Sequence, residues 1–487
     1  MLNELEKEAN ITYTENGAVT NRSSMSACLD LFGTAGALRN APEDEIMRRF
    51  IRAYAEDKTI AMKILFFVRD IRGGLGERRF FRTIFKILAN AEPEVVRKNL
   101  DLVAEYGRFD DLLVLMGTAC EKDAIRLLGK LFRADLNALK DGEDVSLLGK
   151  WLPSVNTSSQ EQSALGKKLA KAFGMSESEY RKSLSALRKE IRIIENNLRE
   201  KDYTFDYGKQ TSRALYKYRK AFLRNDNARY TSYIQAASVG NAKINTSNIY
   251  PYELVEQCLN HNGVMTFEEK AVINATWKNL SEFCNDENAL AVVDGSGSMY
   301  GWGNPRPASV ALSLGLYFAE HNKGEFANHF ITFSRSPQLV DLKGRNFVEK
   351  LQYARSFNEV ADTDIEAVFR LILDTAVKNH ILQEEMPAKL VIISDMEFNY
   401  CTQNASLTNF ENVKKMYEEA GYVLPQLVFW NVQSRNAQQP VTMHETGTAL
   451  VSGCTPRIFS MVAGEIVDPY TMMMEVIGSE RYAAIAA

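Results

Sequence analysis

The residues at 294–299, DGSGSM, place three oxygen-bearing side chains on one short loop. Asp294, Ser296 and Ser298 are separated by single residues, and the glycines between them let the backbone curl so that the three oxygens converge. One carboxylate and two hydroxyls are hard donors of low total charge, which suit Mg²⁺, or Mn²⁺ and Ca²⁺ less specifically. The spacing predicts a divalent-metal site; the alternative interpretation is an ordinary glycine-rich turn.

Two further oxygen donors come from distant segments. Thr363, in ADTDIEAVF, stands at the start of a predicted helix, and Asp395 ends the apolar run KLVIISD. Asp294 ends a similar run, LAVVD, so both aspartates follow predicted buried strands. Because ligands of parallel sheets bind at the carboxyl ends of the strands, we expect these donors to complete one site.

This set closely resembles the metal-ion-dependent adhesion site of the von Willebrand factor A family, written DxSxS with a separate Thr and a separate Asp. The resemblance implies that Ser296 and Ser298 bind the metal directly and that Thr363 binds it directly or through water. Asp294 and Asp395 would act mostly through water. An open coordination position would accept an Asp or Glu from a protein partner.

Hydrolysis at such a metal would need a general base beside an activated water. Glu397 is the nearest candidate, but an acidic residue just after a strand end usually supports a ligand or faces solvent. The five histidines show neither HExxH nor another metal-ligand spacing. The sequence therefore favours a protein that is not an enzyme.

A strongly basic segment lies at 181–230, with fourteen Lys or Arg against six Asp or Glu in a chain of net charge −4. Tyrosines are interleaved with these charges, so the segment offers cations for phosphates and flat rings for unpaired bases. The alternative is a solvated helix face whose tyrosines seal helix packing. The basic run RDIRGGLGERRFFR at 69–82 leaves the same two interpretations open. The candidate RNA contacts are Lys150, Arg181, Arg188, Arg213, Lys217, Arg219 and Arg224.

RDIRGGLGER followed by EYGRFDDLL, upstream of the A-type segment, resembles the TROVE module of the Ro autoantigen family, and TDIEAVF looks like that family's Thr-Asp segment. KWLPS at 150–154, YRKSLSALR at 180–188 and YKYRKAF at 216–222 are closer still to a little-characterised bacterial and viral branch of the same architecture. The resemblance implies a ring of HEAT-like helices closed by the A-type domain, with small noncoding RNA on its outer surface and single-stranded RNA ends in its central hole.

A Ro-type ribonucleoprotein scaffold that binds small noncoding or misfolded RNA is the function that this resemblance implies. The alternative is a metal-dependent protein–protein interaction scaffold that binds no nucleic acid. The salt dependence of any RNA binding separates the two, because phosphate contacts weaken steeply as salt rises.

Two kinds of secondary structure carry these motifs. Residues 42–285 repeat apolar side chains at three- and four-residue spacing, which predicts consecutive amphipathic helices. Beyond them, short apolar runs such as HFITFS at 329–334 and QLVFWNV at 426–432 alternate with helical stretches. The predicted fold class is α + α/β: a HEAT-like α-solenoid over 1–285, a doubly wound, Rossmann-like von Willebrand A domain over 286–465, and a C-terminal helix over 466–487 that packs back on the body.

Length and composition set the broader class. A chain of 487 residues with 45% hydrophobic and 25% charged residues suits two or three globular domains. The six cysteines show no close pair, so neither a disulfide framework nor a Cys-based zinc site is indicated. No secretory signal and no membrane-length apolar run is recognisable. We therefore expect a soluble, cytoplasmic protein.

Overall fold

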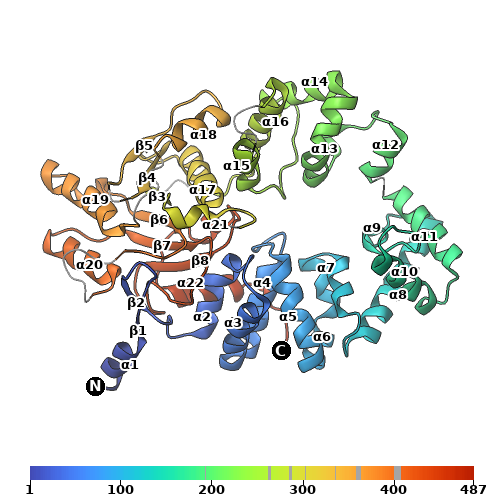
Figure 1. Cartoon of the computed structure of the whole chain (residues 1–487), viewed down its shortest axis with the longest axis horizontal. Helices are drawn as coiled ribbons and strands as arrows, with labels where there is room; N and C mark the ends of the chain where they lie inside the picture. The colour runs from blue at the N-terminus through green and yellow to red at the C-terminus, as the bar shows by residue number, and fades with distance from the viewer. Residues whose placement is uncertain are drawn as a thin grey trace.

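Helices form an arc that leaves a β-sheet body and comes back to it (Figure 1). The computed structural model describes the chain apart from residues 192, 261–264, 285–287, 302, 335, 358–362 and 400–406, and apart from the side chains of residues 3 and 4. The helices of the arc are α2 (Ala27–Thr34), α3 (Glu43–Glu56), α4 (Lys58–Arg69), α5 (Arg78–Ala91), α6 (Pro93–Lys98), α7 (Val103–Tyr106), α8 (Glu121–Asp141), α9 (Leu148–Trp151), α10 (Gln160–Ala172), α11 (Glu177–Glu190), α12 (Ile194–Glu200), α13 (Ser212–Asn225), α14 (Asn227–Ser238), α15 (Pro251–Asn260) and α16 (Phe267–Lys278).

Local sequence signals explain where these helices begin. The Asp57 side chain accepts a hydrogen bond from the Ile60 amide at 2.8 Å and caps α4. Ser176 and Glu179 form a reciprocal capping box at the start of α11. Each helix then buries one apolar face against its neighbours, so that α3, α4 and α5 pack side by side.

The other part of the described chain is built on a sheet of six strands. Its order is β5-β4-β3-β6-β7-β8, parallel except for the edge strand β5. The strands are β3 (Ala289–Asp294), β4 (His329–Phe333), β5 (Leu339–Asp341), β6 (Lys389–Ser394), β7 (Gln426–Asn431) and β8 (Thr448–Ser452). β3, β6 and β8 are buried along their whole length, as strands covered on both faces must be.

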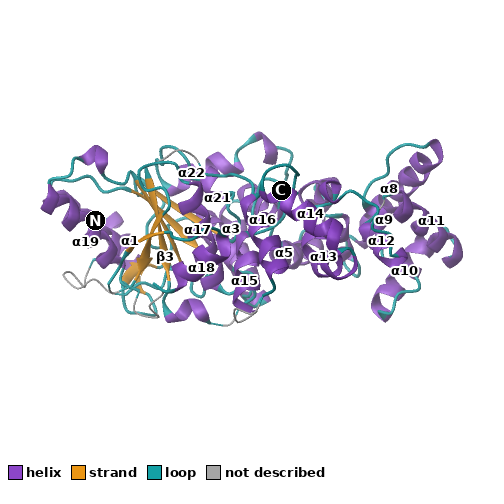
Figure 2. Ribbon diagram, turned by 90° about the horizontal axis from the view of Figure 1, so that it is seen from above, coloured by secondary structure: helices purple, strands orange, loops and turns teal. Residues whose placement is uncertain are grey.

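Helices cover the sheet (Figure 2). They include α17 (Pro307–His321), α18 (Phe347–Arg355), α19 (Ile365–Asn379), α20 (Asn409–Glu419) and α21 (Ile458–Met461). α17 packs against β3 and β6, where Gly315 permits a close approach because an added Cβ would lie 2.2 Å from a methyl of Val293. The predicted α + α/β class is confirmed; HEAT-type repetition stays a prediction, and the predicted boundary at 285 and 286 lies outside the described residues.

The two ends of the arc meet beside the sheet. α2 packs against β8, and α15 packs against α17. Between them, Arg39 donates from Nε to Glu77 at 3.0 Å and from Nη1 to the Tyr252 hydroxyl at 2.9 Å. The Tyr250 hydroxyl also donates to the Leu75 carbonyl at 3.4 Å. Residues of the connections near the beginning of the arc therefore contact residues at the start of α15, near its end, directly.

The far part of the arc has its own core. Apolar side chains from α12, α13, α14 and α16, among them Phe222, Tyr230 and Ile234, form a cluster separate from the main one. α12 packs Ile194 into this second core and makes hydrogen bonds to both sides, from Asn196 to the Arg188 carbonyl at 3.1 Å and from the Tyr218 hydroxyl to Glu195 at 2.9 Å.

Both ends of the chain pack on distant partners. After α1 (Leu2–Asn10), the hairpin of β1 (Ile11–Tyr13) and β2 (Val19–Asn21) contacts the sheet body through bridges from Gly17 to Asn399 and from Asn21 to Gln439. At the other end α22 (Pro469–Ile477) packs on α2 and α4, with Met472 and Met473 buried. In the part of the chain that the structure describes, no helix has the length and apolar character of a membrane span.

Candidate metal centre and basic surface

Asp294 and Asp395 lie at the carboxyl edge of the sheet, where the chain reverses its direction of winding. From β3 the chain proceeds to β4 on one side, whereas from β6 it proceeds to β7 on the other. Adjacent parallel strands that lead to opposite sides leave a crevice at their carboxyl ends. Asp294 ends β3 and Asp395 follows β6, so both carboxylates lie at this crevice.

Short hydrogen bonds bring the loop after β3 together. The Ser296 amide donates to Asp294 Oδ1 at 2.8 Å, and the hydroxyl oxygens of Ser296 and Ser298 are 3.0 Å apart. Ser394, the last residue of β6, donates its hydroxyl to Asp294 Oδ2 at 2.5 Å. The loop thus gathers the first three predicted donors, as their alternation indicates, and Ser394 fixes the carboxylate among them.

Buried negative charge is the main electrostatic feature of this edge. Asp294 and Asp395 are each 2% exposed. Burial and the neighbouring Asp395 carboxylate raise the pKa of Asp294 to about 7. A divalent cation would offset the free-energy cost of burying two neighbouring carboxylates. Two carboxylates with three hydroxyls form a donor set that fits Mg²⁺. The described residues contain no group of three or more His, Cys, Asp or Glu that could hold a metal, so the hydroxyls would be essential.

Thr363 is buried beneath the tip of the N-terminal hairpin. Its hydroxyl accepts a hydrogen bond from the Asn16 amide at 3.3 Å, and the same amide nitrogen donates to the Glu397 carbonyl at 2.6 Å. Asn16 therefore ties Thr363 to the segment after β6. The hairpin thus adds a fourth distant part of the chain to the three segments that the sequence motif names.

Arg435 supplies a positive charge at the same edge. Its Nη2 donates to Asp395 Oδ2 at 2.8 Å, and its Nη1 lies 3.0 Å from Glu15 Oε2. Glu397 is 1% exposed and accepts hydrogen bonds from Asn436 at 2.9 Å and Gln438 at 2.7 Å. Its carboxylate is thus held by the protein, as expected of a supporting residue.

Sequence reasoning missed Asn16, Glu15, Arg435 and Ser394. Ser394 had a local signal, because it directly precedes Asp395 at the end of a predicted strand. The other three had none, since each lies in a segment whose own pattern is that of an ordinary loop. Only the three-dimensional packing brings them to the site.

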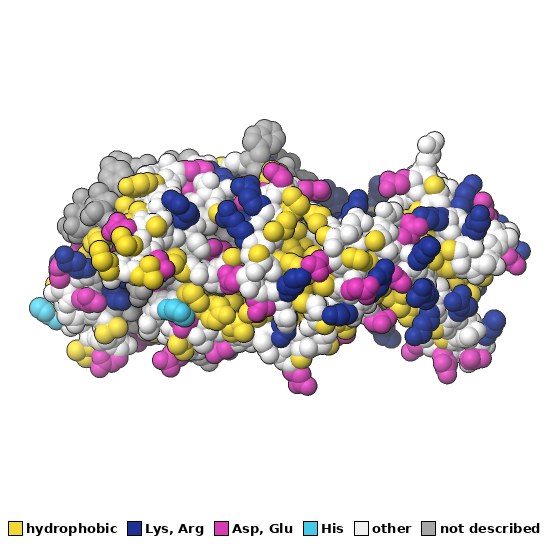
Figure 3. Space-filling view, turned by 90° about the horizontal axis from the view of Figure 1, so that it is seen from below, with side chains coloured by type: hydrophobic (Ala, Val, Ile, Leu, Met, Phe, Trp, Pro, Cys, Tyr) yellow, Lys and Arg dark blue, Asp and Glu magenta, His cyan; other side chains and the backbone are white. Residues whose placement is uncertain are grey.

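The seven predicted RNA contacts fall into two groups on the arc. Lys150, Arg181 and Arg188 belong to the packed helices α9 and α11, and the other four belong to α13, which lies beyond α12 (Figure 1). Arg181, Lys217 and Arg224 are exposed. Lys and Arg side chains gather over the end of the molecule formed by α8 to α11, with acidic side chains among them (Figure 3).

Other members of the set are engaged within the protein. Arg188 donates to the carbonyls of Gly149 at 2.9 Å and Leu152 at 2.7 Å, so it holds the turn after α9. Arg213 pairs with Glu253 at 2.5 Å. Arg219 donates to the Tyr216 backbone carbonyl, and its guanidinium carbon lies 4.5 Å from the centroid of the Tyr216 ring. The guanidinium groups of these three arginines therefore hold neighbouring parts of the protein together.

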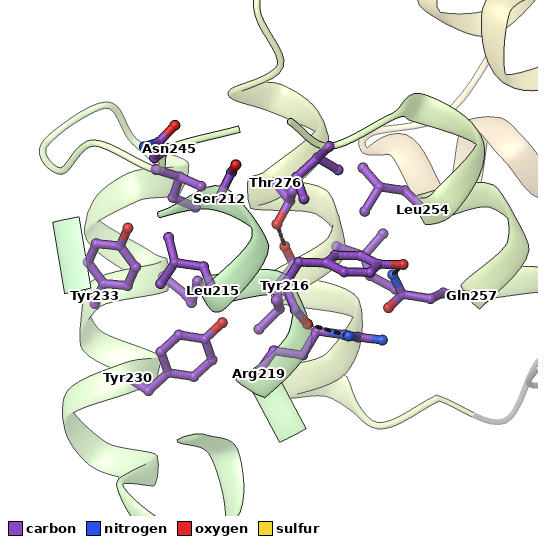
Figure 4. Close-up of a pocket in the computed structure, with 15 residues that line it drawn as sticks. Ser212, Leu215, Tyr216, Arg219, Tyr230, Tyr233, Asn245, Leu254, Gln257 and Thr276 are labelled. Carbon is purple, nitrogen blue, oxygen red and sulfur yellow. Dashed lines mark hydrogen bonds between the residues drawn. The ribbon is translucent and has the colours of Figure 1, made fainter. Parts of the chain in front are cut away.

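The tyrosines of the basic segment also pack against protein. Figure 4 shows Tyr216, Tyr230 and Tyr233 around a pocket where α13 and α14 face α15 and α16. Tyr230 is 2% exposed, the Tyr216 hydroxyl donates to the Glu253 carbonyl at 3.0 Å, and the Tyr233 hydroxyl donates to the Lys243 carbonyl at 2.8 Å. These tyrosines therefore seal helix packing, which is the alternative that the sequence left open. The prediction of stacking on bases is wrong for Tyr230, whose ring is buried.

The basic run at 69–82 forms a turn around buried ion pairs. Arg69, which is 2% exposed, donates from Nε to Asp111 Oδ2 at 2.8 Å. Gly74 closes the turn so tightly that an added Cβ would lie 1.9 Å from the Phe67 carbonyl oxygen. Asp70 accepts hydrogen bonds from Arg481 at 2.7 Å and Tyr482 at 3.0 Å. Much of this motif therefore maintains the fold.

The fold and the site define a two-part protein, in which an arc of helices is joined to a mostly parallel α/β domain with a polar carboxyl edge. Residues 14–127 and 124–290 match the family described as Domain of unknown function (DUF2828), and residues 288–473 match Domain of unknown function (DUF7788). The chain belongs to the DUF2828 family.

One relative and one solved structure are similar along most of the chain. Uncharacterized protein L728 of Acanthamoeba polyphaga mimivirus is 30% identical over 514 residues, which cover 96% of this chain and 87% of that protein. The crystal structure of the Deinococcus radiodurans Ro (RSR) protein matches with a TM-score of 0.38 and 14% identity, over 94% of this chain and 100% of that one.

Proposed function

We propose that this protein is a non-enzymatic, cytoplasmic RNA-binding scaffold of Ro type. In this proposal the helices close into a HEAT-like ring that holds small noncoding or misfolded RNA. The sheet body would be a von Willebrand A-type domain whose metal-ion-dependent adhesion site binds Mg²⁺ and, through it, an acidic protein partner.

The observation that carries the proposal is the buried carboxylate pair at the crevice between β3 and β6. Asp294 and Asp395 are almost fully buried, the Ser296 amide donates to Asp294, and the hydroxyl oxygens of Ser296 and Ser298 are 3.0 Å apart. When bound there, a divalent cation would present a Lewis-acidic position to a carboxylate. Ser296, Ser298 and Thr363 would supply neutral oxygens, while Ser394 holds the Asp294 side chain in place.

The RNA part of the proposal is supported by charge and by the contacts that close the arc. Exposed Arg181, Lys217 and Arg224 leave cations on its surface in a chain whose net charge is negative. The Arg39 contacts with Glu77 and Tyr252 would hold the ring shut. The TROVE-like motifs identified in the sequence favour RNA as the polyanion.

The direct test is to purify the full chain from its native cell under gentle salt, treat half with ribonuclease, and sequence the nucleic acid that stays bound. A discrete small RNA, or a population rich in frayed single-stranded ends, is the expected result. Nucleic acid no richer than a mock purification would contradict it. For a bound RNA, affinity should fall steeply between low and moderate salt, because each phosphate contact releases counterions.

A protein-interaction scaffold without nucleic acid is the second candidate. The groove between α5 and α10 favours it, because Ile87, Leu113 and Leu165 line it. These apolar side chains would suit a protein segment, whereas Arg82, Lys86 and Lys168 of the same groove would suit a phosphate backbone. Co-purification of a protein in a ribonuclease-resistant, chelator-sensitive complex would favour this reading.

A further inference from the structure

Arginines outnumber their acidic partners where α5 faces the 3₁₀ turn η3 (Phe109–Leu115). Asp111 accepts from Arg69, and also from Arg82 Nε at 2.6 Å. Asp110 accepts from Arg82 Nη2 at 2.7 Å and from Arg108 Nε at 2.9 Å. Both carboxylates are therefore shared among several guanidinium groups.

Arg78 takes no part in this sharing of the two carboxylates. It lies one turn before Arg82 on α5, on the same face of the helix, and it has no hydrogen-bond or ion-pair partner among the described residues. Burial and the positive charges of Arg82 and Arg108 lower the pKa of Arg78. The cluster of Arg78, Arg82 and Arg108 thus carries positive charge that nearby acids do not balance.

An aromatic ring borders the cluster. The Arg108 guanidinium carbon lies 3.9 Å from the centroid of the Trp151 ring, and Lys150 Nζ lies 5.6 Å from the same centroid. The stacking orders Arg108, and Lys150 adds another cation. Trp151 is only partly buried, so part of the indole stays open to a ligand.

The basic face of α5 continues into the groove toward α10. Arg78, Arg82 and Lys86 follow one another at four-residue spacing, and Arg82 and Lys86 line the groove together with Lys168 of α10. A network that only maintained the fold would need neither the unpaired Arg78 nor a row of three basic side chains along α5. Planar guanidinium groups bind phosphate oxygens in pairs, which lysine cannot do.

We propose that Arg78, Arg82 and Arg108 bind a phosphodiester group of single-stranded RNA beside Trp151, with the strand continuing past Lys86. The choice of RNA as the ligand rests on the proposed function. Arg78 is the diagnostic residue, because Arg82 and Arg108 also hold the fold through Asp110 and Asp111, whereas Arg78 holds nothing in the described part of the chain.

The test measures binding of a fluorescein-labelled oligouridylate of about twelve nucleotides to the full chain by fluorescence anisotropy at several salt concentrations. Arg78→Gln should weaken binding about five- to tenfold and reduce the slope of log affinity against log salt by about one. Arg79→Gln is the matched control, since Arg79 donates to the Arg39 carbonyl at 3.2 Å; it should leave the Kd unchanged.

Equal affinity of the Arg78→Gln variant and the unsubstituted protein would overturn this site while leaving RNA binding intact. If the unsubstituted protein binds no oligouridylate, this single-strand site fails, whereas the proposed function is decided by the RNA that co-purifies from the native cell. Titration with inorganic tripolyphosphate by calorimetry then decides whether an anion site exists. Heat that disappears in Arg78→Gln supports the cluster as a phosphate site, and no heat in either protein overturns it.

Discussion

Single side chains decide whether the sheet edge can hold a metal. Asp294 brings the buried charge, Ser296 and Ser298 bring neutral oxygens, and Ser394 fixes the carboxylate. Arg435 pairs with Asp395, but burial and the Asp395 carboxylate still raise the pKa of Asp294, so a bound divalent cation would offset unfavourable buried charge. Metal binding should therefore stabilise the fold measurably.

Asp294→Asn should abolish stabilisation by Mg²⁺, because asparagine keeps the shape but lacks the negative charge. For the unsubstituted protein, Mg²⁺ at about 100 times its Kd should add about 2.7 kcal/mol to the free energy of unfolding. Urea unfolding with and without Mg²⁺ measures both values. Asp341→Asn, at an exposed aspartate of β5, is the control and should keep the response; an unchanged response in Asp294→Asn would place the metal elsewhere.

Asp111→Asn should destabilise the arc by about 3–5 kcal/mol, because it leaves the buried Arg69 without a counter-charge. Asp123→Asn is a fair comparison, since Asp123 pairs with the partly exposed Arg97 and should cost about 1 kcal/mol or less. Urea unfolding of the two variants in parallel gives the difference. Similar values for both would mean that the Arg69 pair is not important for stability.

The candidate site was predictable as far as its residues have local patterns. DGSGSM and the two strand-end aspartates can be recognised within a few residues of sequence, because the loop and strand geometry that they need is local. Asn16 and Arg435 could not be found in this way. Their contacts with Thr363 and Asp395 depend on how a hairpin and a loop pack, which no short spacing records.

Among the elements, strands with uniform apolar runs were predicted and short edge pieces were not. β3, β4, β6 and β7 fall on the four predicted runs. β5 has three residues and only one of them is buried, so its sequence carries little strand pattern. β8 is fully buried, but TALVS is too short to be told from a helix fragment by its sequence alone.

The C-terminal turn η7 (Glu480–Tyr482) fastens the end of the chain to the RGG turn of the arc. Arg481→Gln removes the charged partner of Asp70, whose side chain is fully buried and keeps only neutral donors such as the Tyr482 hydroxyl, so we expect a loss of about 1–3 kcal/mol and faster proteolysis after α22. Mass spectrometry of early chymotryptic fragments together with urea unfolding measures both effects, because the substitution leaves the aromatic cleavage site at Tyr482 in place. Lys415→Gln changes a similarly charged but exposed pair on α20 and should behave like the unsubstituted protein; equal proteolysis of both variants would argue against the fastening.

At the scale of the whole molecule, direct contacts between the ends of the arc set its closure. Arg39→Met should release these ends, because one guanidinium holds Glu77 near the beginning and Tyr252 near the end. Hydrogen exchange should then speed up around residues 74–77 and 250–253 while the sheet stays protected. Arg48→Met, at an exposed arginine of α3, should leave exchange unaltered. Unchanged exchange in Arg39→Met would show that helix packing alone closes the arc.

The hairpin of β1 and β2 has a consequence for the order in which this protein matures. Its residues leave the ribosome before those of the sheet body, yet Asn21 bridges to Gln439 and Thr14 donates to the Phe398 carbonyl at 2.6 Å. These partners emerge about four hundred residues later. The carboxyl edge of the sheet that Asn16 contacts can therefore be assembled only after residue 439 has been synthesised, so shorter nascent chains would expose an unfinished edge to the cell's chaperones.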